Sequence, residues 1–408
     1  MKTIFCAAIV LISGTAGASA ADETKTIQIE ITNPYSEAKT DEPISLCLEQ
    51  LEVGFTAKSA VVMNGDDEIP SQLDDYNQDL RADELAFVID LPANSTTTVS
   101  VTLSSAKTDK TYPARTYAQM LLRTSKKGKY AKGINISAFG SSDTYTVLHH
   151  HGVAFESELN AWRIYFNEKQ TTDLYGKFNK GLEIEESLFY PTDEQLARGF
   201  GDDVILVRNS CGAGTLKGWN GEQATHISPV EIRGQKVIAS GPVRAIVEAE
   251  VKGWQYQGSE LNMVCRYTIY AGHRDAQVDI LFDEPLKEEV FVTGVQHLNG
   301  DDAAMYSDHE GLVGSWGTDW PVNDTVKYHK ETVGLGTFIP KKIISEEKAD
   351  KENYLYTICL PGEKTFRYWT AFTSKKETFG YDDSDAWFEY LKAWKKRMEQ
   401  AVEIKIVK

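Results

Sequence analysis

The chain has 408 residues and a formal net charge of −17, with 41% hydrophobic and 25% charged residues. This balance is typical of a folded globular protein, and the length suits one large domain or two ordinary ones. The acidic charge argues against a nucleic-acid partner, because binding phosphates requires a basic face.

The first segment, residues 1–20, has the pattern of a targeting sequence. Lys2 precedes the apolar run TIFCAAIVLISG, and the small residues ASA stand before Ala21 as in a cleavage site. The apolar run is too short to span a bilayer. We therefore expect a signal peptide at 1–20 and an exported protein, periplasmic or secreted, without membrane insertion.

Residues 21–106 form a predicted β-rich region. The segments KTIQIEITN and TTTVSVTLSS alternate apolar and polar residues with a period of two, which is typical of half-buried strands. The polar run SSAKTDKTYPART, at about residues 104–115, then predicts a linker to the rest of the chain.

Within this region, DDYNQDLRADE spaces four oxygen-bearing side chains like the ligands of a calcium loop. The four residues are Asp75, Asn77, Asp79 and Asp83. Leu80 occupies the place where such loops prefer glycine for their sharp turn, so the match is incomplete. We expect a structural calcium at most, distant from the chemistry, and no required cofactor.

The predicted second domain covers 112–408 and contains the stretch LHHHGVAFESELNAWRIYF at 148–166. A strand here would place His149 and His151 on one face. Histidine suits proton transfer because its unperturbed pKa lies near neutrality. The stretch predicts an acid–base strand in which Glu158 is a second candidate acid and Arg163 binds an anion. A structural cluster at a sheet edge, or a zinc site with a third ligand from elsewhere, remains an alternative.

A series of closely spaced strand patterns follows, among them VRAIVEAEVKGW, LNMVCRYTIY and DAQVDILFD. Because no helical period separates them, they predict antiparallel sheets. On CRYTIY, Arg266 and Tyr270 share a face, where the arginine can bind a carboxylate and the tyrosine can move a proton. Such residues are also common on ordinary exposed sheet faces. His226 in ATHISP is an isolated further candidate acid.

The loop GSWGTDWPVNDT places Trp316 and Trp320 on either side of Asp319. Indole faces stack on sugar rings, and a nearby carboxylate holds hydroxyl groups. An equally good interpretation is that the two tryptophans close one end of the hydrophobic core.

Two helices are expected. TDEQLARGFG carries a cap, an early acidic residue and a terminal glycine. SDAWFEYLKAWKKRMEQA places four apolar residues on one face, which should pack near the C-terminus. They are Trp387, Leu391, Trp394 and Met398.

Several longer phrases carry a resemblance to a known family, among them DELAFVIDLP, YPARTYAQMLLR, FESELNAWRIYF, YPTDEQLARGFGDD and GTDWPVNDTVKY. Together they resemble an uncharacterised family of exported bacterial proteins, number 4861 in the domain-of-unknown-function series, over nearly the whole mature chain. Such proteins accompany polysaccharide lyases and unsaturated-uronyl hydrolases, so the resemblance implies a role in glycan utilisation. SGPVRAIVEAEV and RYTIYAGHRDAQVDILFD also look like a galactose-mutarotase-like supersandwich. Neither resemblance supplies a catalytic residue.

The sequence therefore predicts a mostly β protein, an antiparallel β-supersandwich with an N-terminal β-rich region and a few short helices. We expect a carbohydrate-active enzyme that acts on uronic-acid-containing oligosaccharides by β-elimination. In this scheme Arg163 or Arg266 binds the carboxylate. The candidate bases are His149, His151 and Tyr270, and the candidate acids are Glu158 and His226.

Three other functions remain open. A glycoside hydrolase needs two carboxylates, for which Glu158 and Asp319 are available. An epimerase on the same fold is a second alternative. A non-catalytic glycan-binding protein would instead use Trp219, Trp316 and Trp320 as stacking platforms. The enzymatic scheme also expects HHH, CRYTIY and GTDWP to meet across one concave sheet.

Overall fold

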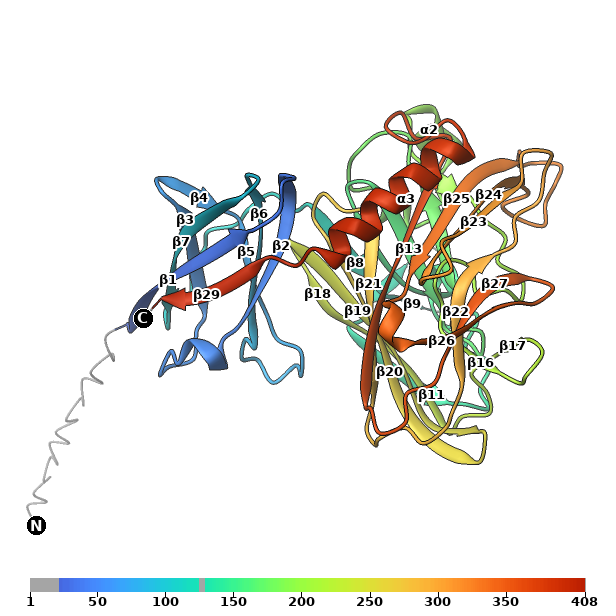
Figure 1. Cartoon of the computed structure of the whole chain (residues 1–408), viewed down its shortest axis with the longest axis horizontal. Helices are drawn as coiled ribbons and strands as arrows, with labels where there is room; N and C mark the ends of the chain where they lie inside the picture. The colour runs from blue at the N-terminus through green and yellow to red at the C-terminus, as the bar shows by residue number, and fades with distance from the viewer. Residues whose placement is uncertain (1–21, 125–128, 408) are drawn as a thin grey trace, which may run out of the picture.

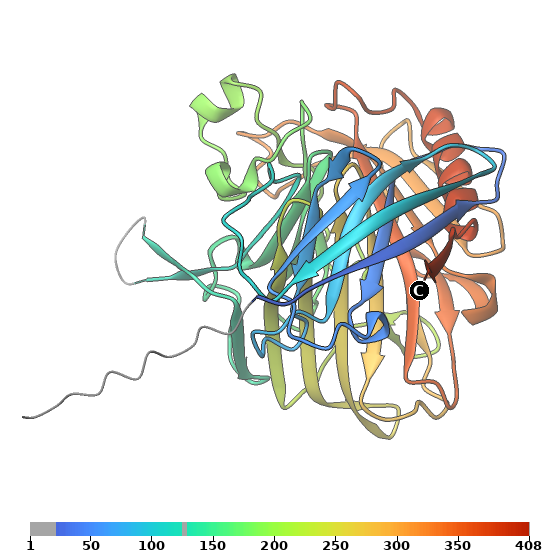
Figure 2. The same cartoon turned by 90° about the vertical axis from the view of Figure 1, so that its left-hand side faces the viewer.

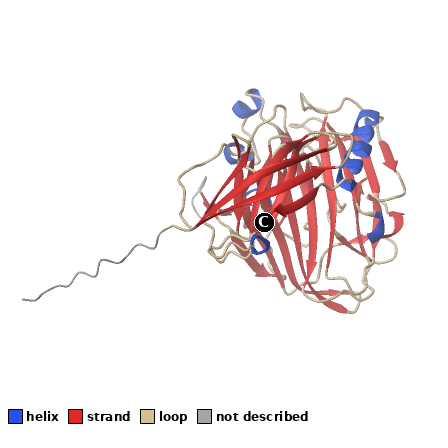
Figure 3. Cartoon of the chain, turned by 60° about the vertical axis from the view of Figure 1, so that its left-hand side comes forward, coloured by secondary structure: helices blue, strands red, loops and turns tan. Residues whose placement is uncertain are grey.

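The computed structural model describes residues 22–124 and 129–407 (Figure 1). The predicted signal peptide at 1–20 lies outside these residues. Strands dominate the described chain and helices are few (Figure 3). The strands pair antiparallel within both the smaller and the larger sheets. The prediction of a mostly β, antiparallel protein with a few short helices is therefore confirmed.

The N-terminal region is a sandwich of two sheets. One sheet contains, in spatial order, β29 (Glu403–Val407), β1 (Thr24–Asn33), β7 (Ser95–Ser104), β3 (Ser59–Asn64) and β4 (Asp67–Ile69). The other contains β2 (Lys39–Cys47), β6 (Glu84–Leu91) and β5 (Ser71–Asp74), and the short 3-10 helix η1 (Glu49–Leu51) follows β2. Alternation builds the core between them, since Val99, Val101 and Leu103 of β7 are buried and the residues between them are not.

The last strand of the chain completes this sandwich. β29 pairs with β1 from Gln28 to Thr32, so the two ends of the described chain lie side by side (Figure 1). Residues 403–407 therefore belong spatially to the N-terminal sandwich, although the predicted boundary assigned 112–408 to the larger domain.

The larger body has a nine-stranded sheet as its first layer. Its strands in spatial order are β11 (Asn135–Phe139), β18 (Ile232–Ser240), β19 (Arg244–Tyr256), β20 (Ser259–Tyr270), β21 (Asp275–Phe282), β28 (Thr365–Ser374), β25 (Glu331–Phe338), β24 (Leu312–Asp319) and β23 (Ala304–Ser307).

Two five-stranded sheets form the second layer. One contains β15 (Asp202–Asp203), β14 (Thr172–Gly176), β13 (Asn160–Tyr165), β12 (Gly152–Ser157) and β8 (Thr116–Gln119). The other contains β17 (Ala224–Thr225), β16 (Lys217–Trp219), β22 (Phe291–Gln296), β27 (Asn353–Ile358) and β26 (Ile344–Ala349). A separate hairpin pairs β9 (Leu121–Arg123) with β10 (Tyr130–Lys132), and a 3-10 turn, η3 (Lys341–Ile343), precedes β26.

The main core fills the space between these layers. Strand β20 points Cys265, Tyr267 and Ile269 into it, whereas Arg266 and Tyr270 point to the opposite, outer face. In β13 of the second layer, Trp162 and Ile164 point into the same core. Each layer thus has an outer face available for polar residues, and the two outer faces lie on opposite sides of the body.

The outer face of the nine-stranded sheet is partly covered. Helix α3 (Ser384–Glu399) packs on β24 and β25 through Trp387, Leu391 and Trp394, with Met398 at the edge, as predicted. Gly336 permits this close contact, because an added Cβ would lie 2.3 Å from Leu391 Cδ2. The N-terminal sandwich lies in front of β18–β21 (Figure 2).

Two short helices lie in the long connection between β14 and β15. They are α1 (Ile184–Ser187) and α2 (Asp193–Ala197). α2 begins with the capping box of Thr192 and Gln195, which confirms the helix predicted from TDEQLARGFG. Across 22–124 and 129–407, every helix is too short or too polar to span a bilayer.

Candidate active site

The candidate site lies on the outer face of the second layer, around Arg163. Arg163 of β13 is directly opposite Asp173 of β14 in the sheet register. Because its neighbours Trp162 and Ile164 point into the core, Arg163 points to the outer face. It is nevertheless only 3% exposed, since the connection that carries α1 and α2 covers it.

Buried partners hold the Arg163 guanidinium from several directions. Nε donates to Asp173 Oδ2 at 2.9 Å, and Nη2 donates to the same oxygen, to Asp203 Oδ2 at 3.2 Å and to the Tyr165 hydroxyl at 2.9 Å. Tyr165 in turn donates to Asp173 Oδ2 at 2.6 Å. Burial, reinforced by the Asp173 carboxylate, raises the pKa of Asp203 well above its usual range. Arg163 is thus a rigid, paired cation that has no room for a substrate carboxylate.

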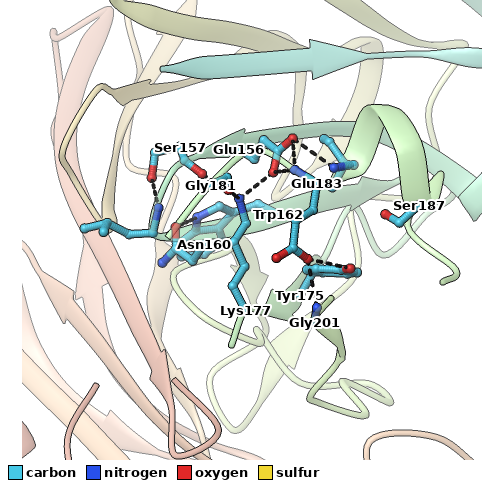
Figure 4. Close-up of polar contacts among 12 residues, drawn as sticks. Glu156, Ser157, Asn160, Trp162, Tyr175, Lys177, Gly181, Glu183, Ser187 and Gly201 are labelled. Carbon is cyan, nitrogen blue, oxygen red and sulfur yellow. Dashed lines mark hydrogen bonds and ion pairs between the residues drawn. The ribbon is translucent and has the colours of Figure 1, made fainter. Parts of the chain in front are cut away.

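A second buried network anchors the covering connection (Figure 4). The fully buried Glu156 carboxylate accepts from Lys177 Nζ and from the backbone N–H groups of Glu183 and Ile184, at 2.9–3.0 Å for the latter two. Lys177 Nζ also donates to the carbonyls of Ser157 and Gly181. All three ammonium protons therefore have an acceptor, which satisfies a charge that would be costly to bury alone.

The anchored connection places Tyr190 next to the Arg163 guanidinium. Arg163 Nη1 donates to the Tyr190 hydroxyl at 2.6 Å, and the Phe189 ring lies 4.6 Å from Arg163 Cζ. The chain reaches this position through Leu188 and Phe189, both with left-handed φ, at 52° and 69°. Left-handed backbone at large side chains stores strain, which concentrates at functional sites.

Tyr190 retains a proton to donate. Because a guanidinium has no acceptor, the Tyr190 oxygen must accept from Arg163, and its own O–H points elsewhere. Burial raises the pKa of Tyr190 although Arg163 lowers it, so the hydroxyl stays protonated near neutrality. With 41% of the residue exposed, this proton can reach a ligand.

The three histidines form a 3-10 turn, η2 (His149–His151), and not the predicted strand. His150 and His151 have left-handed φ of 47° and 65°, and their rings contact different neighbours, Phe189 and Tyr145 respectively. The prediction from strand alternation was wrong here, because a chain turning between Leu148 and β12 cannot keep a period of two. A second strained segment thus faces the first at the same site.

His151 has the properties of a general base. Its Nδ1 lies 2.6 Å from the Tyr145 carbonyl oxygen, which can only accept, so Nδ1 carries the proton and Nε2 carries the lone pair. The Tyr145 ring stacks on the imidazole at a centroid distance of 3.9 Å. Burial lowers the pKa of His151, with the field of Arg163 adding to the effect, so the ring is neutral near pH 7.

The other two histidines complete the cluster. His149 packs between the rings of Tyr130 and Tyr190, at 4.2 and 5.6 Å, and burial lowers its pKa. His150 is fully buried, and its Nδ1 has no hydrogen-bond partner in the described chain. The nearby Arg123 is exposed; its Nε donates to the Leu148 carbonyl at 3.2 Å. Among the described residues no carboxylate pairs with Arg123, so its exposed guanidinium is open to a ligand, unlike that of Arg163.

The remaining predicted residues do not join this cluster. Glu158 accepts from Arg115 Nε and from the Gly272 N–H, and Arg115 also binds Asp41 of β2. Glu158 thus belongs to an ion-pair bridge between the two bodies. His226 lies near Lys217 and Arg233, and burial followed by the Lys217 charge lowers its pKa to about 4.

The tryptophan loop is also separate. Trp316 is 2% exposed and packs in the cluster under α3, so its face is unavailable to a sugar ring. Trp219 is buried as well, at 7% exposure. Trp320 is half-buried with Lys330 Nζ 5.9 Å from its ring centre, and Asp319 accepts from Asn299 Nδ2 at 2.7 Å.

Arg266 and Tyr270 line a different cavity, on the outer face of the nine-stranded sheet. The cores of both layers lie between them and Arg163. The predicted meeting of HHH, CRYTIY and GTDWP across one concave sheet was therefore wrong.

The acidic loop at 75–83 uses its oxygens locally. Asp75 Oδ2 accepts from the Leu80 N–H at 2.7 Å, Asn77 Oδ1 from the Asp79 N–H at 2.8 Å, and Asp79 Oδ1 from the Arg81 N–H at 2.9 Å. Asp83 Oδ2 accepts from the Tyr76 N–H at 2.7 Å. No group of three or more His, Cys, Asp and Glu side chains suited to a metal occurs among the described residues.

Sequence reasoning missed Tyr190 and Arg123. Tyr190 lies outside any strand or helix and comes within reach of Arg163 only through the folded connection. Arg123 ends the short strand β9, and its proximity to the histidines depends on the contact between Leu122 and Leu148. Both stand in phrases that carry the family resemblance, Arg123 at the end of YPARTYAQMLLR and Tyr190 at the start of YPTDEQLARGFGDD, but that resemblance assigns neither residue a role.

Comparison with solved structures gives distant likenesses. The chain is similar to a protein in glycosyl hydrolase family 38 from Enterococcus faecalis, with 10% identity and a TM-score of 0.44. It is also similar to an alpha-mannosidase from Enterococcus faecalis V583, with 8% identity and a TM-score of 0.44. Both alignments cover 94% of this chain but only 47% and 46% of the other, so the chain spans about half of their length.

Comparison with known sequences and family models identifies the family of the chain. None of the curated protein sequences matches the chain. A family model, described as a domain of unknown function (DUF4861), matches residues 31–404, which include both bodies and every residue of the cluster around Arg163. The resemblance found in the sequence is confirmed, and the chain belongs to the DUF4861 family.

Proposed function

We propose that the chain is a carbohydrate-active enzyme that cleaves uronic-acid-containing oligosaccharides by β-elimination at the His151–Tyr190 site. One observation carries the proposal. Arg163 donates to the hydroxyls of Tyr190 and Tyr165, and the neutral His151, whose tautomer is fixed, lies beside the Tyr165 ring at a centroid distance of 6.4 Å. This is the base and acid pair that an elimination needs.

The reaction step uses the two groups in opposite roles. His151 Nε2 takes the proton from the carbon that bears the carboxylate. The electron pair of that C–H bond forms a carbon–carbon double bond, and the neighbouring C–O bond breaks. Tyr190 donates its proton to the leaving oxygen, and proton exchange with water restores both side chains. No oxidant or further reactant is required.

Two arginines then have different tasks. Arg123 binds the uronate carboxylate and stabilises the charge that develops on it, because its guanidinium is exposed beside the histidine turn. Arg163 positions the Tyr190 hydroxyl and fixes Tyr165. The carboxylate-binding role predicted for Arg163 thus passes to Arg123 in this proposal.

Elimination suits this cluster better than hydrolysis. A hydrolase places two carboxyl groups on opposite sides of the bond that it breaks. The carboxyl groups at this site, Asp173 and Asp203, are buried and both pair with Nη2 of Arg163.

The test is turnover of a panel of uronate oligosaccharides, followed by the ultraviolet absorbance of the unsaturated product and by mass spectrometry. Wild type should release an unsaturated uronide, and His151→Gln and Tyr190→Phe should each lose this activity while remaining folded. His309→Gln, at an exposed histidine that contacts Glu347 of β26, is the matched control and should keep it. Hydrolytic products, or full activity in both site variants, would overturn the proposal.

A glycan-binding function is the second candidate. Tyr145 and Tyr190 are 40% and 41% exposed and lie beside the histidines, as in an aromatic sugar-binding surface. Binding of panel members without any bond cleavage, lost in Tyr145→Ala, would favour this function over the enzyme.

A further inference from the structure

A cleft of about 1080 Å³ lies between the N-terminal sandwich and the outer face of the nine-stranded sheet. Its floor comes from β20, β21 and β28, and one wall from β2, β6 and the loop that precedes β6. Figures 1 and 2 show the two bodies that face each other across it. The cleft and the cluster around Arg163 lie on opposite faces of the larger body.

The register between neighbouring strands places the side chains of the cleft floor in rows. One row runs Glu248, Arg266, Asp279 and Arg367 across β19, β20, β21 and β28, with alternating charge. Within it, Arg266 Nη2 lies 2.7 Å from Glu248 Oε1, and Arg367 Nε lies 2.5 Å from Asp279 Oδ1. Opposite charges on neighbouring strands stabilise the row, and both arginines line the cleft.

The next row is uncharged. Thr268, Gln277 and Trp369 are consecutive partners across β20, β21 and β28, and all three line the cleft. The Trp369 ring stacks on Phe338 at 5.8 Å with an interplanar angle of 14°, which fixes its orientation. Trp369 is half-buried, so part of the ring stays open beside Gln277. A fixed indole next to an amide is suited to stack on a sugar ring and to bind its hydroxyls.

The wall is held in place by Arg244. Its Nε donates to Asp74 Oδ2 at 2.6 Å, its Nη2 to Glu84 Oε2 at 2.9 Å and its Nη1 to the Tyr270 hydroxyl at 3.0 Å. The guanidinium thus ties β5 and β6 of the sandwich to the edge of the floor. The cleft is a preformed space rather than a gap between bodies that are free to separate.

The balance of charged residues that line the cleft indicates which class of ligand it binds. The lining contains four arginine or lysine residues and four carboxylates. The pairs of the floor and wall neutralise one another, so the cleft has no excess of either sign to attract a polyanion. Paired charges and amides still offer many donors and acceptors, which matches a ligand with many hydroxyl groups.

We propose that this cleft binds a neutral oligosaccharide segment, stacked on Trp369 and hydrogen-bonded by the rows of Arg266 and Gln277. The site is separate from the acid–base cluster, and its test does not depend on the proposed elimination. It would hold a neutral part of the glycan at the junction of the two bodies.

Calorimetric titration of the full chain with four neutral hexasaccharides (of β-1,4-glucose, mannose, galactose and xylose) and with hexagalacturonate tests the proposal. At least one neutral hexasaccharide should bind, and Trp369→Ala should weaken it by about tenfold or more. Gln277→Ala should weaken the binding as well. This second variant keeps the test valid if Trp369→Ala fails to fold. Trp320→Ala, at the other half-buried tryptophan, should bind like wild type.

Three results would overturn the inference. One is the absence of binding for all four neutral hexasaccharides. Another is unchanged affinity in Trp369→Ala and Gln277→Ala. The third is tighter binding of hexagalacturonate than of every neutral probe, lost in the same two variants. Failure of the elimination assay leaves each of these outcomes measurable, so the two proposals fail separately.

Discussion

Arg163 Nη1 donates a hydrogen bond of 2.6 Å to the hydroxyl of Tyr190. The two residues belong to different parts of the fold, because Arg163 lies in β13 and Tyr190 follows α1 in the covering connection. The bond therefore joins a rigid sheet to a strained loop and fixes the direction of the tyrosine proton. A catalytic acid built in this way is oriented before a ligand arrives.

Tyr190→Phe should reduce product formation by a factor of about 10²–10⁴, the usual contribution of one positioned acid. The ring remains, so its packing against His149 is kept and the melting temperature should change little. Initial rates on the best uronide substrate, together with a thermal melt, measure both effects. Tyr306→Phe, at a distant and half-buried tyrosine, is the control. A rate close to wild type would remove Tyr190 from the mechanism.

Arg163→Met should destabilise the fold by about 3–5 kcal/mol, because it leaves the Asp173 charge buried without its cation. Urea unfolding measures the loss. Arg367→Met removes a cation of which 52% is exposed, and it should cost about 1 kcal/mol or less. Similar losses in the two variants would show that the buried network contributes no more than a surface pair.

Lys177→Met should loosen the connection that carries Tyr190. The variant leaves Glu156 buried without its ammonium partner, at a cost of about 3–5 kcal/mol. Hydrogen exchange should therefore accelerate first at the Glu183 and Ile184 amides, which donate to that carboxylate. Lys132→Met, at an exposed pair with Glu185, is the control. Unchanged exchange at 183 and 184 would contradict the anchoring role.

The activity should persist at pH values below the ordinary histidine pKa. Burial, with the field of Arg163, lowers the pKa of His151 from 6.5, and the base acts only when neutral. The acid limb of kcat/KM should therefore lie below pH 6.5, and activity should fall when the pH drops through the lowered pKa. An acid limb above 6.5 in the rate profile would exclude His151 as the base.

The sequence predicted what depends on local periodicity and missed what depends on distant contacts. The face of Trp387, Leu391 and Trp394 and the cap at Thr192 follow from spacing along one element, and both are present. Left-handed backbone at His150 and His151 has no local signal, because histidine rarely adopts it and nothing in HHH marks the turn.

Long-range pairing explains the other differences. β29 pairs with β1, which lies at the other end of the chain, and no pattern in EIKIV indicates which strand it pairs with. Trp316 was an expected sugar platform because it stands in a glycine-rich loop sequence, but it lies within β24 and α3 covers it. Arg163 was predicted to bind a substrate carboxylate, but in the folded sheet Asp173 and Asp203 already pair with it.

His226 should make the folded state sensitive to acid. Burial, followed by the charge of Lys217, lowers its pKa in the folded chain to about 4, with Lys169 and Arg233 adding to the effect and Glu168 opposing it. The unfolded value is about 6.5. Above pH 6.5 both states are neutral, so the full stability is present. As the pH falls from 6.5 towards 4, only the unfolded state binds the proton, and stability is lost.

The loss attributable to His226 should reach about 2 kcal/mol near pH 4, a value reduced for the part of the ring that water reaches. Urea unfolding of wild type and His226→Gln at several pH values isolates the contribution of His226, because the other titrating groups are common to both proteins. The stability difference between them should change by this amount between pH 7 and pH 4, in favour of the variant at low pH. His309→Gln should not show this gain, because Glu347 raises the pKa of His309 instead. A difference between wild type and His226→Gln that is constant with pH would show that water solvates His226 in the folded protein.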